Sequence, residues 1–167
     1  ILLATTPKVA QHHGAGHTAE IGALVRQALW LALAVGLIAS ALLLSAEPVL
    51  HLMKVDPVLI EPCMQYLRGI ASGLPATALF YVLRCFSDGL GRTRPSMVLG
   101  LCGLALNIPL NYIFIYGHFG MPALGGVGCG WATAIVMWAI LLGMTGWVRR
   151  AVVYKASEVF SRFEWPQ

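Results

Sequence analysis

A long internal stretch of this chain contains no charged side chain. No Asp, Glu, Lys or Arg occurs between Pro95 and Val148. One helical crossing of a bilayer needs about 20 predominantly apolar residues, so this stretch is long enough for two crossings. Residues 116–126, with the sequence YGHFGMPALGG, are rich in Gly and Pro and predict the turn between the two helices. The sequence therefore predicts a helical hairpin within a membrane.

The composition of the whole chain supports a membrane protein. Hydrophobic residues make up 58% of the 167 residues and charged residues only 11%, whereas soluble domains have about 45–50% and 25%. A domain of this length leaves much of its surface in solvent, so one soluble core cannot bury this much apolar surface. A soluble enzyme, a disordered chain and a nucleic-acid-binding domain are all disfavoured. The net charge of +4 comes from few residues in connecting loops, so no nucleic-acid partner is expected.

Charged residues also mark the limits of the other spans. The chain is uncharged between Arg26 and Glu47, and a less regular apolar stretch follows. Because the chain begins at Ile1 within an apolar stretch and lacks signal-peptide features, we expect a fragment of a longer protein. The expected fold is all-α, a polytopic membrane helix bundle, with residues 1–148 forming part of one transmembrane lobe. The predicted spans are residues 22–46, 58–86, 95–116 and 126–148, and residues 1–10 are interpreted as the end of an earlier span.

The basic residues predict the orientation of the spans, because cytoplasmic loops are enriched in Lys and Arg. The second and fourth connections contain only one basic residue, Lys54. Arg68 lies within a span, and the first, third and fifth connections contain the rest: Lys8, Arg26, Arg84, Arg92, Arg94, Arg149, Arg150, Lys155 and Arg162. We therefore place both ends of the chain in the cytoplasm. Residues 149–167 predict an amphipathic helix on the inner leaflet, and a solvated linker is the alternative.

Two patterns that resemble ligand sites are interpreted as structural. His13 and His17 are spaced like one box of a membrane di-iron site, but such a site needs several boxes, and the intervening glycines would break the helix. The glycine-rich segment 125–130 lacks the preceding strand and the Lys-Ser/Thr ending of a phosphate-binding loop. We expect it to let helix backbones approach closely. The four scattered cysteines are expected to be packing thiols.

The span over 95–116 contains the polar residues that are most indicative of function. Asn107 and Asn111 are four residues apart and therefore share a helix face. Pro109 lies between them and, because it has no N–H, frees the carbonyl of Ala105. Amides at this depth are costly against lipid, so they are expected to face a cavity or neighbouring helices.

The next span places Thr133 at a similar depth, with Cys129 one turn away on the same face. We expect these two residues and the two asparagines to converge between the helices. Such a cluster suits a cation held by neutral oxygens, or hydrogen bonds to a charged partner elsewhere. The alternative is that it only holds the bundle together through interhelical hydrogen bonds.

Other residues in and beside the span over 58–86 have more than one interpretation. Pro75 frees the carbonyl of Ala71, which gives either a bend used in transport or a fixed kink. Arg68 is expected to snorkel outward or to pair with Glu61. Asp88 is expected to form ion pairs with the arginines around its turn. The alternative is that these ion pairs hold one conformation of the transporter closed on this side.

Five segments share their sequence and their order with one family of membrane proteins. They are PKVAQHHGAG (7–16), LRCFSDG (83–89), TRPSM (93–97), NIPLN (107–111) and GGVGCGWAT (125–133). Together they resemble the multidrug and toxic compound extrusion (MATE) transporters of the NorM-type branch. The resemblance covers nearly the whole chain and is weak only over residues 149–167.

The resemblance implies a twelve-helix antiporter of two six-helix lobes. This chain would cover the end of helix 2 through helix 6, with 149–167 as the start of the inter-lobe connection. It implies export of cationic amphipathic drugs and dyes in exchange for Na⁺ or H⁺ across a bacterial inner membrane, by alternating access and without a cofactor. The chain would thus belong to a secondary active transporter, not an enzyme, and would need the remaining half of the transporter.

The resemblance also assigns residues. Four of them match the polar cation site of the amino-terminal lobe: Asn107, Asn111, Cys129 and Thr133. The acidic residue of helix 1 that would complete this site is not in this chain. Since Asn111 cannot take a proton, direct proton carriage by its helix is in doubt. Pro75 and Pro109 are the expected helix kinks.

Two other functions stay open. A lipid-linked oligosaccharide flippase of the same superfamily would need several Arg or Lys in its cavity, and only Arg68 lies within a span. An integral membrane enzyme would need intramembrane Asp or Glu, or a complete set of His ligands.

Overall fold

The computed structural model describes residues 7, 9–11, 18–117 and 124–150. These residues form helices and short connections, and this part of the chain contains no strand. Four helices are long and apolar enough to cross a membrane. The all-α membrane fold is therefore confirmed. The helices are α2 (Thr18–Leu44), α3 (Glu47–Leu52), α4 (Pro57–Gly89), α5 (Arg94–Tyr116) and α6 (Gly126–Arg150).

The four long helices begin and end within about one turn of the predicted spans. The short helix α3 was not expected, because the sequence there is a charged connection between two spans. Pro48 stands in its first turn, where a missing N–H costs nothing. The interpretations of residues 1–10 and 151–167, and of the histidines at 12, 13 and 17, fall largely or wholly outside the described residues.

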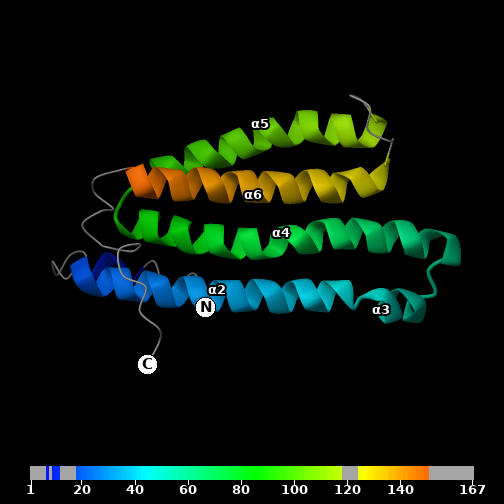
Figure 1. Ribbon diagram of the computed structural model, residues 1–167, viewed down its shortest axis with the longest axis horizontal. Helices are drawn as coiled ribbons and strands as arrows, with labels where there is room; N and C mark the ends of the chain where they lie inside the picture. The colour runs from blue at the N-terminus through cyan, green and yellow to red at the C-terminus, as the bar shows by residue number, and fades with distance from the viewer. Residues whose placement is uncertain (1–6, 8, 12–17, 118–123, 151–167) are drawn as a thin grey trace.

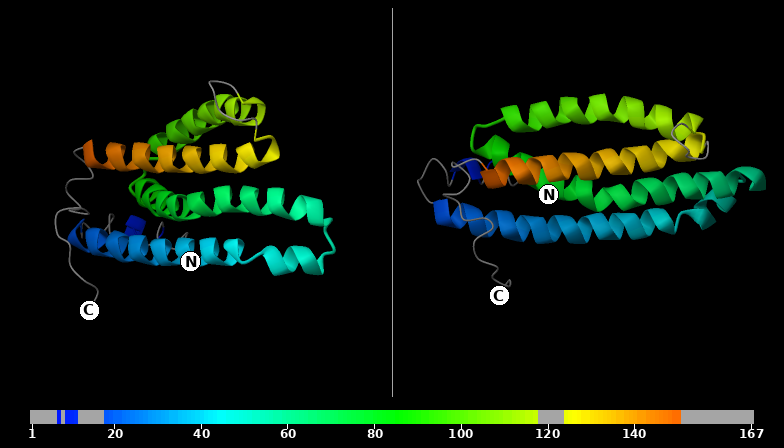
Figure 2. Two further views of the ribbon diagram at one scale, coloured as in Figure 1. Left: turned by 45° about the vertical axis from the view of Figure 1, so that its right-hand side comes forward. Right: turned by 45° about the horizontal axis from the view of Figure 1, so that its top comes forward.

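The long helices lie side by side in the spatial order α2, α4, α6, α5, so α6 separates two helices that follow each other in the chain (Figure 1). The further views in Figure 2 show the same order. Helices α4 and α6 run in the same direction, while α2 is antiparallel to α4 and α5 is antiparallel to α6. Only four residues, 90–93, join α4 to α5. The two nevertheless touch little, because each packs on α6 instead.

Small residues explain why α4 and α6 pack so closely. Gly69 and Gly73 are one turn apart on α4, and they face Gly130 and Ala134 of α6. A Cβ atom added at Gly130 would lie 2.5 Å from the carbonyl oxygen of Tyr66. Small residues at four-residue spacing let two helix backbones approach in a membrane, where dispersion contacts replace the hydrophobic effect. The expected packing role of the glycine-rich segment 125–130 is confirmed for Gly128 and Gly130, whereas Gly125 and Gly126 have nothing within 4 Å of an added Cβ.

Glycines also define how α5 lies on α6. Gly128 of α6 abuts the backbone of Phe114, and Gly103 of α5 packs against Ile140. Further along, Gly143 meets the side chain of Leu99. These contacts run in opposite directions along the two chains, as expected for a hairpin.

The distribution of charges follows the predicted topology. Apart from Arg68, every described arginine lies at the end of the bundle where α2 and α5 begin and α4 and α6 end. We call this the basic end; in Figure 1 it is on the left. A buried cluster that includes Val25, Phe86 and Met144 packs α2, α4 and α6 together near this end. The outer sides of the helices carry exposed Leu, Ile and Val, as expected for surfaces that meet lipid or further helices.

Candidate functional site

The two asparagines of α5 are hydrogen-bonded to each other. The Nδ2 atom of Asn111 donates to Oδ1 of Asn107 at 2.7 Å, and both side chains are half-buried. Ile108 and Tyr112, which follow them in sequence, are mostly exposed, so the amides lie on the side of α5 nearer α6. The carbonyl oxygen of the Asn111 side chain is buried and has no hydrogen-bond partner among the residues that the structure describes. Since an unpaired buried acceptor is costly, this oxygen is suited to receive a donor or a cation.

The polar residues of α6 form a second intrahelical pair. The hydroxyl of Thr133 donates to the backbone carbonyl of Cys129 at 2.7 Å, and both residues are half-buried. The contacts of Gly128 with Phe114 and of Gly103 with Ile140 show which residues of α5 and α6 lie opposite each other. Counting along the two antiparallel helices from these contacts places Asn111 opposite the turn between Cys129 and Thr133.

The structure therefore brings the four predicted residues to one depth, but as two separate pairs. The hydroxyl of Thr133 is engaged with its own helix, and the amide of Asn111 with Asn107. Both bonds are intrahelical, so neither holds α5 to α6. Packing between these helices comes instead from the glycine contacts described above.

Pro75 lies inside α4. Side chains of the two neighbouring helices, α2 and α6, donate hydrogen bonds to backbone carbonyls in the turn that precedes it. The hydroxyl of Ser40 on α2 donates to the carbonyl of Ala71 at 2.6 Å. This is the carbonyl that Pro75 deprives of its helical donor. On the other side, the indole Nε1 of Trp138 on α6 donates to the carbonyl of Ser72 at 3.1 Å. The regular helical donor of the Ser72 carbonyl is the N–H of Ala76, which Pro75 does not remove. Only the Ser40 bond therefore replaces a donor that is lost at Pro75.

Glycine makes the first of these contacts possible. A Cβ atom at Gly36, one turn before Ser40, would lie 2.7 Å from the Cα of Pro75. The absence of a side chain lets α2 approach the proline closely enough for the Ser40 hydroxyl to reach α4. The sequence predicted the free carbonyl of Ala71 but not its partner. The available signal was Ser40, the one serine in the apolar run over residues 28–44.

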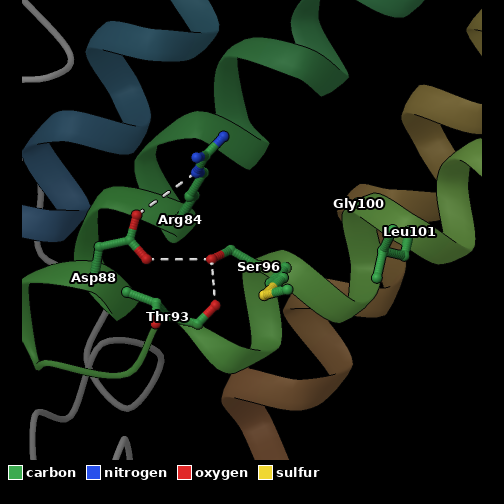
Figure 3. A pocket seen from close by; sticks show the side chains of 7 residues that line it. Arg84, Asp88, Thr93, Ser96, Gly100 and Leu101 are labelled. Carbon is green, nitrogen blue, oxygen red and sulfur yellow. Dashed lines mark hydrogen bonds and ion pairs between the residues drawn. The ribbon is translucent and has the colours of Figure 1, made fainter.

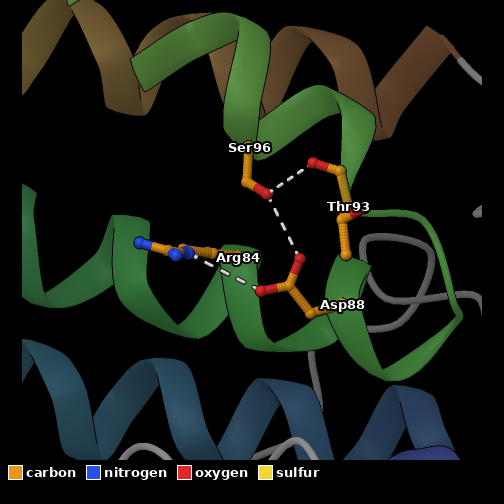
Figure 4. A network of polar contacts seen from close by, with 4 residues as sticks. All are labelled: Arg84, Asp88, Thr93 and Ser96. Carbon is orange, nitrogen blue, oxygen red and sulfur yellow. Dashed lines mark hydrogen bonds and ion pairs between the residues drawn. The ribbon is translucent and has the colours of Figure 1, made fainter. Parts of the chain in front are cut away.

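A polar cavity of about 410 Å³ lies at the basic end, between the last turns of α4 and the first turns of α5 (Figure 3). Arg84 Nε and Asp88 Oδ2 are 3.6 Å apart on its wall. The hydroxyl of Ser96 donates to Asp88 Oδ1 at 3.2 Å and lies 2.9 Å from the Thr93 carbonyl oxygen (Figure 4). The predicted pairing of Asp88 with a neighbouring arginine is confirmed, and Arg84 provides it.

The opposite end of the bundle has an apolar pocket and an exposed ion pair. Arg68 Nη1 and Glu61 Oε1 are 3.8 Å apart, which is one of the two arrangements expected for Arg68. Both side chains are more than half exposed, so this pair adds little to stability. A pocket of about 520 Å³ opens nearby between α3, α4 and the start of α6. Its lining is mainly apolar and includes Leu50, Cys63 and Val127.

The described residues contain no group of three or more His, Cys, Asp or Glu side chains that could hold a metal ion. Cys63, Cys85, Cys102 and Cys129 are all free thiols. Only Cys85 is buried, whereas Cys102 is exposed on the outer side of α5.

Comparison with known proteins assigns a family. The model of the family MatE matches residues 1–113. The chain is 64% identical over 166 residues to the multidrug resistance protein PmpM of Pseudomonas aeruginosa, covering 99% of this chain and 35% of that protein. It is 47% identical over 167 residues to the multidrug resistance protein MdtK of Klebsiella pneumoniae, covering 99% of this chain and 36% of the relative. The chain thus spans about a third of the length of these relatives.

A solved structure has the same fold. It is the inward-facing conformation of a multidrug resistance MATE family transporter of the MOP superfamily. The TM-score is 0.81, and the match covers 90% of this chain and 34% of that one at 24% sequence identity.

Proposed function

Because the chain belongs to the MatE family, we propose that it forms part of the amino-terminal lobe of a multidrug efflux antiporter in a bacterial inner membrane. Family membership and the membrane-spanning helices support an integral membrane transporter. Two relatives of high identity are named multidrug resistance proteins. The complete transporter would export cationic amphipathic drugs and dyes in exchange for Na⁺ or H⁺.

The observation that carries the site proposal is the unpartnered side-chain oxygen of Asn111. A neutral oxygen that is buried, and already polarised by the bond from its own amide to Asn107, can accept a cation without a charge of its own. Oxygen atoms are the ligands that hard cations prefer. Asn107, Cys129 and Thr133 lie close to the same depth and would supply further oxygens or orient the first. Because a side-chain amide neither gains nor loses a net proton near neutral pH, coupling to H⁺ would require a titratable group, such as a carboxyl, elsewhere in the transporter.

Alternating access requires helices that can adopt two shapes. Pro75 and Pro109 each interrupt the series of backbone hydrogen bonds of a membrane-spanning helix. We assign them as the points where the helices bend. Ion binding would stabilise one bend and drug binding the other. Coupling arises only if each ligand has a different affinity for the two conformations.

The basic end of the bundle would face the cytoplasm. Cytoplasmic loops are enriched in Lys and Arg, and all described arginines other than Arg68 gather there. Trp147 lies near this end and Tyr116 near the other, both partly exposed, as interfacial aromatic residues are. A cysteine-accessibility scan of the two ends in intact cells would test this orientation.

The function is tested by ethidium efflux from cells expressing the complete transporter. Asn107→Ala and Asn111→Ala are expected to lower ion-driven efflux while membrane abundance stays unchanged. Ile108→Ala, on the exposed side of the same helix, is the matched control and should retain efflux. Normal efflux by both asparagine variants would remove these residues from the coupling site.

A further inference from the structure

The cavity at the basic end has a polar half and an apolar half. Arg84, Asp88, Thr93 and Ser96 form the polar half, on the last turns of α4 and the first turn of α5. Met97 also lines the cavity. Gly100 and Leu101 continue the lining along α5, away from Asp88 (Figure 3). Met97 is 68% exposed and Leu101 is 59% exposed. The groove therefore joins a charged site at the end of the bundle to an apolar surface that extends into the membrane zone.

Glycine keeps the apolar half of the groove open. Gly100 is exposed, and a Cβ atom added there would meet nothing within 4 Å. This differs from Gly103, three residues later, where an added Cβ would collide with Ile140. One glycine of α5 thus serves packing with α6, and the other leaves space on the outer side.

The polar half offers two opposite charges side by side. Asp88 lies between Arg84 and Ser96 (Figure 4) and is only 25% exposed, whereas Arg84 is 49% exposed. The contact between Arg84 and Asp88 uses one nitrogen, Nε, at 3.6 Å. This is longer and less specific than a bidentate pair, so the terminal N–H groups can donate to another anion. The Thr93 side chain makes no capping bond to α5, so its hydroxyl can also donate.

We propose that this groove binds a phospholipid with a primary ammonium headgroup, phosphatidylethanolamine, from the leaflet at the basic end. The phosphate accepts hydrogen bonds from Arg84 and Thr93, and the ammonium group donates to Asp88. One acyl chain lies along Met97, Gly100 and Leu101. The volume of about 410 Å³ is within the roughly 300–1,000 Å³ of small-molecule sites.

Charge complementarity selects this headgroup over the two common alternatives. The phosphate of an anionic headgroup such as phosphatidylglycerol can also bond Arg84, but this headgroup offers no cation to Asp88, whose carboxylate then repels the phosphate. Phosphatidylcholine has the cation, but its trimethylammonium group has no N–H to donate. The assignment rests on the proposed orientation of the basic end at the cytoplasmic face. It does not depend on which drugs or ions are transported.

The test uses the complete transporter in nanodiscs with equal parts of the three lipids, followed by native mass spectrometry of retained lipid. Phosphatidylethanolamine should be retained about tenfold over phosphatidylcholine, the ratio expected for one charge-assisted hydrogen bond. Asp88→Asn should abolish this preference, because its amide can still accept from Ser96 but carries no charge. Arg84→Gln should lower retention of every phospholipid.

Two matched controls separate the groove from the general surface. Arg92→Gln removes an exposed arginine that does not line the cavity and should leave retention unchanged. Gly100→Leu fills the groove and should lower retention. Gly146→Leu introduces the same side chain at another glycine with open space around it and should have no effect.

Equal retention of the three lipids, or equal effects of Arg84→Gln and Arg92→Gln, would overturn the proposal. Thermal melting and size-exclusion profiles of each variant exclude loss of retention through misfolding. Lipid retention is measured without transport. A failure of the efflux proposal therefore leaves this test valid, and a failure here leaves the efflux proposal standing.

Discussion

The hydroxyl of Ser40 lies 2.6 Å from the carbonyl oxygen of Ala71, across the interface between α2 and α4. This carbonyl has lost its own helical donor because Pro75 has no N–H. In lipid, a backbone carbonyl without a donor is costly, and water cannot replace the bond. The contact therefore links the position of α2 to the broken turn of α4.

We expect Ser40→Ala to destabilise the complete transporter by about 1 kcal/mol, because the Ala71 carbonyl then has no donor. The measurement is thermal melting in detergent or nanodiscs. Ser45→Ala is the control, since its hydroxyl bonds only to Ala41 of its own helix at an exposed position. An equal loss for both variants would mean that the interhelical bond contributes nothing specific.

The hydrogen bond from Trp138 to the Ser72 carbonyl, next to Ala71, gives a further prediction. Trp138→Phe removes the indole N–H that bonds Ser72 but keeps an aromatic ring, and should cost about 1 kcal/mol. Trp131→Phe, at a similarly exposed site on α6, should cost less. Combined with Ser40→Ala, the Trp138→Phe effect should depart from additivity, because the two acceptors are the carbonyls of adjacent residues, Ala71 and Ser72. Strict additivity in a double-mutant cycle would show that the two bonds are independent.

Close packing of α4 and α6 predicts a strong effect at Gly130. An added Cβ would lie 2.5 Å from the Tyr66 carbonyl, which is backbone and cannot rotate away. Gly130→Ala should therefore destabilise the protein by about 1–3 kcal/mol and lower the folded yield. Gly126→Ala adds the same methyl group where nothing lies within 4 Å, and should be tolerated. The readout is the monodisperse fraction after extraction together with its melting temperature.

A substitution at Thr133 can distinguish an effect on ion binding from an effect on packing. Its hydroxyl bonds only its own helix backbone at 2.7 Å, so Thr133→Val should change stability by less than about 0.5 kcal/mol. If the hydroxyl also contributes to the proposed cation site, the Na⁺ or H⁺ gradient needed for half-maximal efflux should rise several-fold. Thr145→Val, which loses an equivalent bond to Leu141, should leave that requirement unchanged. Identical efflux curves for the two variants would exclude Thr133 from the site.

The sequence was sufficient for features that depend on composition and short spacing. The spans follow from apolar length, and the pairs of Arg84 with Asp88 and Arg68 with Glu61 follow from helical periodicity. The spatial order of the helices could not be predicted in the same way. It depends on matching small-residue surfaces on two distant segments, such as Gly73 and Ala134. The donors to the carbonyls of Ala71 and Ser72 depend on that order and were missed for the same reason.

The candidate site shows the same division. The sequence placed the two asparagines on one face and at the depth of Thr133, because rise per residue is fixed in a helix. It did not indicate that Asn111 would donate to Asn107 and leave its own oxygen unpartnered. That outcome depends on side-chain rotamers, which spacing alone does not determine.

The insertion of α6 between α4 and α5 has a consequence for biosynthesis. When the ribosome has delivered α4 and α5 to the bilayer, the glycine face of α4 still lacks its partner, because α6 is synthesised last of the three. The α4–α5 hairpin cannot close on itself without occupying the place of α6. Any contact that α4 and α5 made through these faces would have to be released before α6 could pack between them and complete both interfaces.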